Sequence, residues 1–351
     1  MIAAIAMLGA MSIAAPTVND LAPLAREAGL AGEIYVADKD RVLAHHVASR
    51  PDRPHHAGEL WRWASVSKQL TATLIMQAVD EGRLATSDTL DKALPAFKGQ
   101  TAARITIAAL LTHTSGLPNP DDSQVRQAGD FPDFYRRTKG AGSDALGYCA
   151  GAPKAEPGQG FAYNNCDYIV LGAVLERIYG QPYRTLVRQR LGRAAGLKSI
   201  DVAEAGRARP RLAPGYLENG VREPDFELST FGAAGAVYGK AIDLVRFDQA
   251  LLRGQLLSPA ARAQAWAGDP KLGYVAFGVW SYPASLRGCD KPVKLVERRG
   301  EIGGVEVRNL LAPERGRALV VFADSAGIDF GEIWQGSGLS YRLASAAFCG
   351  T

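Results

Sequence analysis

The sequence predicts an α+β fold: an antiparallel sheet flanked by terminal helices, with a mostly helical lobe inserted between N- and C-terminal strands. Apolar side chains alternate in short segments near both ends of the chain, and they recur every three to four residues in between. An isolated hairpin is only marginally stable in water, so the N-terminal strands must pair with the C-terminal ones. The terminal helices then cover one face of the sheet, and the inserted lobe covers the other.

Alternating apolar residues predict strands, and apolar residues that recur every three to four positions predict helices. Near the N-terminus we expect a helix over Asp20–Ala28, strands over Glu33–Ala37 and Val42–Val47, and a helix from Ser65 to Gly82. Between 84 and 257 we expect mostly helix and loop, with helices over Ile105–Leu111, Tyr168–Tyr179, Pro182–Leu191 and Ile242–Leu252. Beyond these we expect strands over Gly273–Tyr282, Val293–Arg298, Val305–Leu311 and Ala318–Ala323, and a last helix over Ile333–Phe348.

This order of elements predicts two structural units. The sheet domain is discontinuous and comprises 18–80 and 260–351, whereas the helical lobe comprises 81–259. A cleft between two such units is a usual place for a small-molecule site, so we expect the active site there.

The composition is that of an ordinary globular protein, with 47% hydrophobic residues, 22% charged residues and a net charge of +4. No basic run with interleaved aromatic residues is present, so nucleic acid is not an expected partner. No window predicts a transmembrane span. The expected partner is a small-molecule or peptide substrate, and the oligomeric state is left open.

The N-terminal segment predicts export. Met1–Ala15 is apolar and small, and Ser12-Ile13-Ala14 has the small-x-small pattern of a signal-peptidase site. Residues 1–15 are therefore interpreted as a signal peptide, which implies a periplasmic or secreted protein. No Lys or Arg precedes the apolar run, so a misplaced start or a frayed apolar end is the alternative.

The four cysteines form no Cys-x-x-Cys pair, which excludes zinc-ribbon and thioredoxin-type sites. Their even number allows two disulfides in an oxidising compartment. We favour Cys149–Cys166 on proximity and Cys289–Cys349 by elimination, and four buried free thiols are the alternative.

Ser65-Val66-Ser67-Lys68 is the first candidate for chemistry, because residues three apart share one face of a helix. Burial of Lys68 would favour its neutral form, which can deprotonate the Ser65 hydroxyl. The Ser65 N–H at the helix start could form half of an oxyanion hole. A capping serine beside a solvated lysine is the alternative.

Tyr163-Asn164-Asn165 is the second candidate, on a turn-rich loop before an apolar helix. The phenol of Tyr163 could relay a proton if a nearby lysine lowered its pKa. Asn165 could donate to a substrate carbonyl, or it could simply cap the helix.

Two further segments are ambiguous. His113, in Leu110-Leu111-Thr112-His113-Thr114-Ser115-Gly116-Leu117-Pro118, could be the base of a Ser-His pair, but we favour a buried histidine that ties the loop. Arg298-Arg299-Gly300-Glu301 lies at a Gly-rich strand edge that could admit a substrate backbone, or form a plain turn. The pairs His45-His46 and His55-His56 are adjacent residues that chelate poorly, so we expect no metal site there.

Taken together and in this order, the segments resemble the serine beta-lactamase and penicillin-binding-protein superfamily, in particular its class C-like branch of hydrolases and esterases. Ser65 and Lys68 match its Ser-x-x-Lys motif, Tyr163 and Asn165 its Tyr-x-Asn motif, and Leu110–Leu117 a family hallmark. Stretches 161–172 and 232–247 are also similar, and the likeness covers roughly 33–323.

The resemblance implies a mechanism that uses no metal ion and no organic cofactor. Ser65 would attack a carbonyl to form an acyl-enzyme, and Lys68 and Tyr163 would share the roles of base and acid, with the first base left open. Asn165 would orient the substrate, and the N–H groups of Ser65 and Glu301 would hold the oxyanion.

The chain departs from the family where Lys, His or Trp, a small residue and Gly are usual. Here Arg298 retains the positive charge and could pair with a substrate carboxylate, Arg299 is bulky and is expected to narrow the cleft, and Gly300 is retained. We therefore expect an exported serine hydrolase acting on an ester, a D-amino-acid peptide or amide, or a beta-lactam. The alternative is a catalytically weak or silent protein that binds peptidoglycan-type ligands.

Overall fold

The computed structural model describes residues 17–127, 129–136, 141–208 and 210–350. The predicted signal peptide, residues 1–15, lies outside the described residues. Within the described ranges, no helix combines the length and the apolar character needed to cross a membrane.

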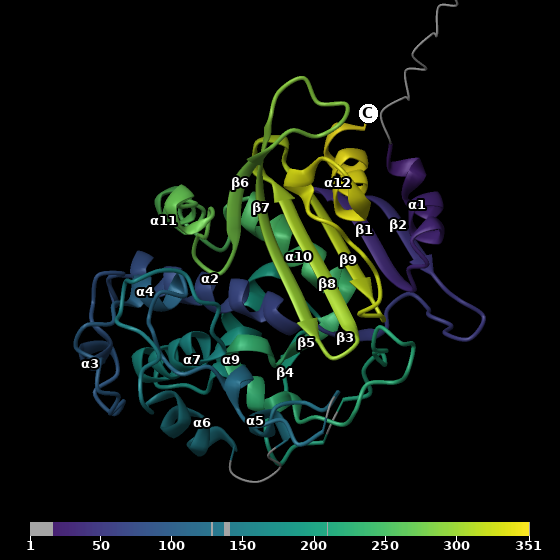
Figure 1. The fold of residues 1–351 in the computed structure, drawn as a ribbon. Coiled ribbons are helices and arrows are strands. Elements are labelled where there is room, and N and C mark those ends of the chain that lie inside the picture. The colour runs from purple at the N-terminus through teal and green to yellow at the C-terminus, as the bar shows by residue number, and fades with distance from the viewer. Residues whose placement is uncertain (1–16, 128, 137–140, 209, 351) are drawn as a thin grey trace, which may run out of the picture.

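A six-stranded antiparallel sheet forms the upper part of the molecule in Figure 1, with strand order β2-β1-β9-β8-β7-β6. Its strands are β1 (Gly32–Asp38), β2 (Val42–Ala48), β6 (Trp280–Ala284), β7 (Val293–Ile302), β8 (Val305–Ala312) and β9 (Arg317–Ala323). Strand β1 of the N-terminal hairpin pairs with the C-terminal strand β9 along its whole length, from Gly32 opposite Ala323 to Asp38 opposite Arg317. The predicted α+β fold with an antiparallel sheet is confirmed.

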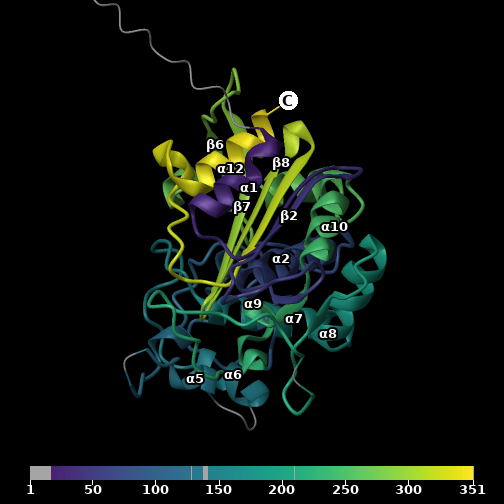
Figure 2. The ribbon, with the colours of Figure 1, turned by 90° about the vertical axis from the view of Figure 1, so that its right-hand side faces the viewer.

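Helices cover both faces of this sheet. The terminal helices α1 (Leu21–Glu27) and α12 (Gly338–Cys349) lie together on one face, as Figure 2 shows. The other face packs on α2 (Ser67–Asp80) and α10 (Ala241–Leu252). Side chains alternate along each strand, so β1 gives Ile34 to the first core and Tyr35 to the second.

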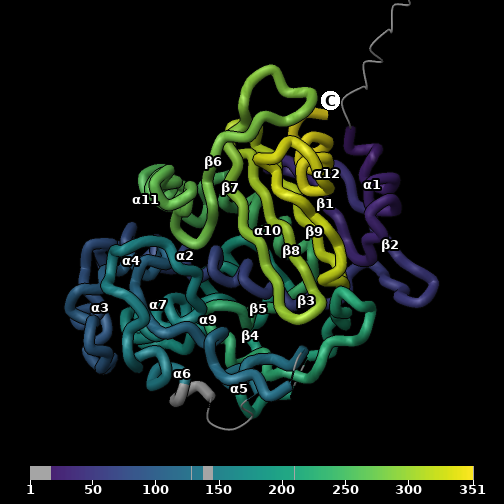
Figure 3. Tube along the Cα trace, viewed as in Figure 1, coloured from purple at the N-terminus to yellow at the C-terminus, as the bar shows by residue number. Residues whose placement is uncertain are grey.

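The helical lobe forms the lower half of the trace in Figure 3. Its helices are α3 (Leu90–Ala93), α4 (Ile107–Leu111), α5 (Asp133–Arg136), α6 (Ala141–Cys149), α7 (Asn165–Tyr179), α8 (Tyr183–Leu186) and α9 (Gly232–Gly235). A π-helix over Val187–Arg193 continues α8, and α11 (Pro259–Ala265) packs beside α2. Single 3-10 turns lie at Val18–Asp20, Ala64–Val66, Pro120–Asp122, Leu228–Phe231, Pro270–Leu272, Pro313–Arg315 and Ile333–Gln335.

Several predicted elements differ from the structure. A small three-stranded sheet, unpredicted from the sequence, orders β3 (Leu60–Arg62), β5 (Val237–Lys240) and β4 (Asp201–Val202). The strand predicted from Gly273 begins only at Trp280, because Gly273 and Tyr274 both have φ of 65° and turn the chain. The predicted last helix is interrupted at Gly336, where φ is 71°.

Two disulfides join Cys149 to Cys166 and Cys289 to Cys349, which confirms the favoured pairing. The first links the end of α6 to the first turn of α7, and the second links the β6–β7 connection to the end of α12.

Candidate active site

The chain presents Ser65 at the junction between the small sheet and helix α2. Strand β3 ends at Arg62, and a single 3-10 turn over Ala64–Val66 leads into α2. Ala64 is fully buried and has φ of 48°, a left-handed conformation that disfavours a residue with a Cβ. Such strain persists only where the surrounding packing enforces it, which is common at functional sites. Ser65 itself is half-buried, with its hydroxyl toward the lobe.

The structure brings Ser65, Lys68 and Tyr163 together. The Ser65 Oγ lies 2.6 Å from the Tyr163 Oη and 3.1 Å from the Lys68 Nζ. Lys68 is 0% exposed, so the alternative of a capping serine beside a solvated lysine is wrong. Its ammonium donates to the Asn165 Oδ1 at 2.6 Å and to the Ala234 carbonyl at 2.9 Å.

Burial and neighbouring charges together lower the pKa values of both potential bases, Lys68 and Tyr163. Burial is the main influence on Lys68 and lowers its pKa to about 8; the positive charge of Arg298 acts in the same direction, and Tyr163 opposes it. Burial alone would raise the pKa of Tyr163, but the positive charges of Arg298 and Lys68 outweigh it and lower that pKa. A base can therefore be unprotonated beside Ser65 near neutral pH.

Capping of helix α7 places Asn165 in the site. The side chain of Asn164 caps the helix by accepting from the Cys166 N–H at 2.8 Å. Asn165 is the first helical residue, so the interpretation of Asn165 as the cap is wrong. Its amide is free to accept from Lys68 on one side and to donate to Asp121 and Tyr135 on the other.

Arg298 and Arg299 on β7 point to opposite faces of the sheet, as adjacent strand residues must. Arg298 is 2% exposed and donates from Nε to the Ser65 carbonyl at 2.9 Å and from Nη2 to the Tyr163 Oη at 2.8 Å. Arg299 instead pairs with Glu297 and Glu332, each at 2.7 Å. The expectation that Arg299 narrows the cleft is therefore wrong.

Gly300 allows β7 to lie directly against the start of the Ser65 turn. A Cβ at this position would approach the Trp63 carbonyl oxygen to 2.7 Å and the Ser65 nitrogen to 3.1 Å. Any side chain would therefore push the strand away from Ser65.

The hairpin after Gly300 orients the backbone of Glu301. Gly303 and Gly304 form a two-residue turn between Ile302 and Val305, with φ of 58° at Gly303. Because hydrogen-bonded pairs alternate along an antiparallel ladder, the Glu301 N–H points to the edge away from β8. Strand β6 begins at Trp280, opposite Glu297, so β6 does not extend along β7 as far as Glu301.

His113 lies close to these groups but outside hydrogen-bonding contact with Ser65. The ring is 3% exposed, and its Nδ1 accepts from the Asn164 N–H at 3.2 Å and lies 2.9 Å from the Asp167 Oδ2. Burial, together with the charges of Arg298 and Lys68, holds the pKa of His113 well below its usual range. These contacts tie the loop to α7, as the structural interpretation of His113 expected.

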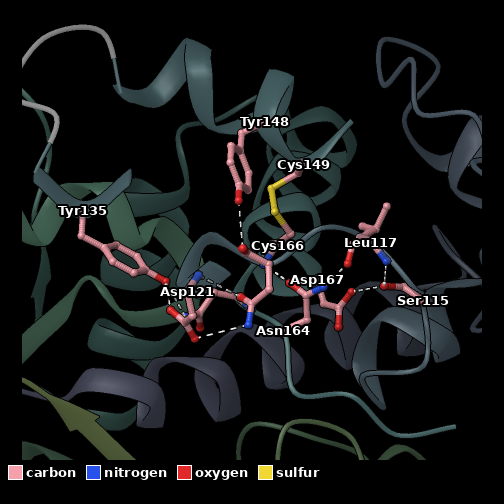
Figure 4. The surroundings of a disulfide bond; sticks show 11 residues. Ser115, Leu117, Asp121, Tyr135, Tyr148, Cys149, Asn164, Cys166 and Asp167 are labelled. Atoms are coloured by element: carbon pink, nitrogen blue, oxygen red, sulfur yellow. Dashed lines mark hydrogen bonds between the residues drawn. A yellow bond between two sulfur atoms is a disulfide. The ribbon is translucent and has the colours of Figure 1, made fainter. Parts of the chain in front are cut away.

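Sequence reasoning missed four residues that support the site. Ala234 supplies a carbonyl to Lys68, and Asn119 accepts from the backbone N–H of Asn165. Asp121 and Tyr135 accept from the side-chain amide of Asn165. Figure 4 shows the Tyr135 hydroxyl pointing at the Asp121 carboxylate near the Cys149–Cys166 disulfide. Ala234 lies in a Gly-rich segment whose buried helix α9 packs tightly on α7, and nothing in the local sequence marks the other three.

The fold and the Ser65–Lys68–Tyr163 cluster are those of a serine hydrolase of the Ser-x-x-Lys type. Residues 22–327 match the family model described as Beta-lactamase, so this chain belongs to the Beta-lactamase family.

Two curated relatives are matched over part of their length. A putative penicillin-binding protein, PbpX of Bacillus subtilis, is 29% identical over 66% of this chain and 58% of its own length. The D-alanyl-D-alanine-carboxypeptidase/endopeptidase AmpH of Escherichia coli is 27% identical over 62% of this chain and 56% of its own length. The chain thus matches little more than half the length of these relatives.

Solved structures resemble this chain over nearly its whole length. A D-stereospecific amidohydrolase from Streptomyces has a TM-score of 0.76 and 23% identity, covering 95% of this chain and 98% of its own. The D-amino acid amidase from Ochrobactrum anthropi SV3 has a TM-score of 0.78 and 20% identity, covering 93% of this chain and 98% of its own. These likenesses show a shared fold.

Proposed function

We propose that this protein is an exported amidohydrolase that cleaves an amide or peptide bond of a D-amino acid through an acyl-enzyme on Ser65. The observation that carries the proposal is the position of the Ser65 Oγ, 2.6 Å from the Tyr163 Oη and 3.1 Å from the Lys68 Nζ. The choice of an amide follows the D-amino acid amidase and D-stereospecific amidohydrolase that share the fold.

Acylation begins when the Lys68–Tyr163 pair removes the Ser65 proton. The Ser65 Oγ then forms a bond to the substrate carbonyl carbon, and the negative charge that develops on the carbonyl oxygen is held by the N–H groups of Ser65 and Glu301. When this intermediate collapses, the C–N bond breaks and the leaving amine takes the proton from the same pair.

Deacylation repeats these steps with water. The unprotonated pair takes a proton from a water molecule, whose oxygen attacks the ester carbonyl of the acyl-enzyme. The C–Oγ bond then breaks, Ser65 regains its proton, and the acid product leaves.

Asn165 and Arg298 each hold reacting groups in position. Asn165 fixes the Lys68 ammonium through its Oδ1 and donates from its Nδ2 to Asp121. Arg298 stabilises the phenolate form of Tyr163 and fixes the backbone of Ser65, and pairing with a substrate carboxylate remains a prediction for its other N–H groups.

Export is part of the proposal. The small, apolar segment Met1–Ala15 has the pattern of a signal peptide, and the two disulfides are typical of an oxidising compartment. A periplasmic or secreted protein would meet both conditions.

The test compares wild type with Ser65→Ala on a panel of D-alanine amide, L-alanine amide, a p-nitrophenyl ester and a chromogenic cephalosporin. We expect a burst and turnover from wild type, the highest kcat/KM on the D-amide, and a mass increase on Ser65 equal to the acyl group. A protein that binds these compounds but releases product no faster than Ser65→Ala would be the silent binding protein instead.

A further inference from the structure

Next to the site lies an exposed carboxylate, that of Asp121, which has no role in the mechanism described above. Asp121 lies in a 3-10 turn over Pro120–Asp122 and is exposed, yet its Oδ1 accepts from the Tyr135 hydroxyl and from the Asn165 Nδ2, the latter at 3.2 Å. No ion pair among the described residues involves Asp121, whereas its neighbour Asp122 pairs with Lys154 at 3.6 Å.

The turn that carries Asp121 is fastened to the reactive residues. The Asn119 Nδ2 donates to the Tyr163 carbonyl at 3.2 Å, and its Oδ1 accepts from the Asn165 N–H at 3.2 Å. The carboxylate is therefore positioned relative to Ser65 rather than free to drift on the surface.

Asp121 retains capacity for a further donor. A carboxylate offers about four acceptor sites. Its Oδ2 has contacts of 3.4 Å each to the Asn119 and Asn165 amides, which is long for a hydrogen bond. A cationic donor from solvent can therefore reach it at little cost to the existing contacts.

The arrangement of the site indicates which part of a substrate meets this carboxylate. The Ser65 Oγ contacts the Tyr163 Oη and the Lys68 Nζ. The Asn165 amide in turn connects Lys68 to Asp121. With Tyr163 as the group that returns the proton to the leaving amine, the acyl group is assigned to the Lys68 and Asn165 side of Ser65, toward Asp121. An α-ammonium is separated from the attacked carbonyl carbon by only one atom, so it belongs to the part of the acyl group that lies next to Ser65.

We infer that Asp121 binds the free α-ammonium group of the acyl part of the substrate, so that the enzyme takes amides with an unblocked N-terminal amino acid and disfavours N-acylated ones. The inference rests on the proposed function and specifies its substrate class. A charge-assisted hydrogen bond of this kind is about twice as strong as a neutral one.

The experiment compares D-alanine p-nitroanilide with N-acetyl-D-alanine p-nitroanilide, which share one leaving group. Wild type should prefer the free amine. Asp121→Asn keeps the shape and can still accept from Tyr135 and Asn165, and it should lose about 10- to 100-fold in kcat/KM on the free amine, mainly through KM. The loss on the N-acetyl substrate should be at least tenfold smaller. Asp122→Asn is the matched control and should lose less than about twofold on either substrate.

A binding measurement keeps the test independent of amide turnover. D-alanine amide and its N-acetyl form are each titrated as inhibitors of p-nitrophenyl ester hydrolysis, and Asp121→Asn should weaken only the first. Equal losses on both compounds, or a wild-type preference for the N-acetyl form, would overturn the assignment of Asp121. Ester release that is the same in wild type and Ser65→Ala would instead overturn the proposed function.

Discussion

Replacing Arg298 by Met tests the electrostatics of the site directly. The Nη2 of Arg298 lies 2.8 Å from the Tyr163 Oη, and its charge also lowers the pKa of Lys68. Met is unbranched and uncharged, although shorter than Arg, so the substitution removes the cation and fills part of the volume of the Arg298 side chain.

The expected size of the effect follows from this distance. Two unit charges at 2.8 Å interact by about 6 kcal/mol at an effective dielectric constant of ~20, which is an upper limit. Measured shifts from one close charge are about 1–3 pKa units. Because the removed charge is positive, the pKa values of both Tyr163 and Lys68 rise. Less of the base is then unprotonated at pH 7, and kcat/KM falls by roughly 10- to 1,000-fold there.

The assay is the pH dependence of kcat/KM on the preferred amide. Wild type should gain activity as the pH rises toward about 8, the pKa of Lys68. In Arg298→Met this rising limb should move to higher pH by about 1–3 units, and activity should recover partly under alkaline conditions.

A matched variant separates charge from geometry. Arg298→Lys keeps the positive charge but loses the planar fork, so its limb should move by less than about one unit. A uniform loss at every pH in Arg298→Met, with the limb unmoved, would mean that Arg298 acts by holding the Ser65 carbonyl. In that case the electrostatic reasoning would be refuted.

Three further predictions concern the reacting groups and the frame around them. Lys68→Ala should lower the acylation rate by about 100-fold or more, measured as the burst rate, and a rate within about twofold of wild type would exclude it as a base. Gly300→Ala should lower kcat by about 100-fold because its Cβ would meet the Trp63 carbonyl oxygen at 2.7 Å, whereas Gly147→Ala, with open space around the added methyl, should leave kcat unchanged. Replacing both Cys289 and Cys349 by Ser should lower the free energy of unfolding by roughly 4 kcal/mol, given the separation of 60 residues, with kcat retained; denaturant unfolding with an activity assay checks both.

The sequence predicted best those strands whose apolar alternation is long enough to be recognised. Strands β1, β8 and β9 each have at least seven residues, and their predicted ranges match closely. The small sheet was missed because β3 and β4 have three and two residues, too few for any period. Their pairing joins segments far apart in the chain, such as Trp61 opposite Gly239, and local pattern carries no information about such contacts.

The residues of the site differ in the same way: some stand in motifs that can be recognised from the sequence, and others do not. Ser65, Lys68 and Tyr163 stand in short motifs whose spacing already indicates their chemistry, and the structure brings them together. Asp121 and Tyr135 stand in no such motif, and they reach Asn165 only because the turn at Pro120 and helix α5 fold against the start of α7. Their part in the site follows from tertiary contacts alone.

The contacts of Lys68 explain how this buried lysine can lose its proton near neutral pH. No ion pair among the described residues joins Lys68 to a carboxylate, and its ammonium is instead fixed by the neutral oxygens of Ser65, Asn165 and Ala234. A carboxylate in direct contact would raise the pKa of Lys68 and keep it charged. The Asn165 amide separates Lys68 from Asp121. The site therefore contains a base, Lys68, whose pKa is about 8, and it also has an exposed carboxylate, that of Asp121, on the far side of Asn165.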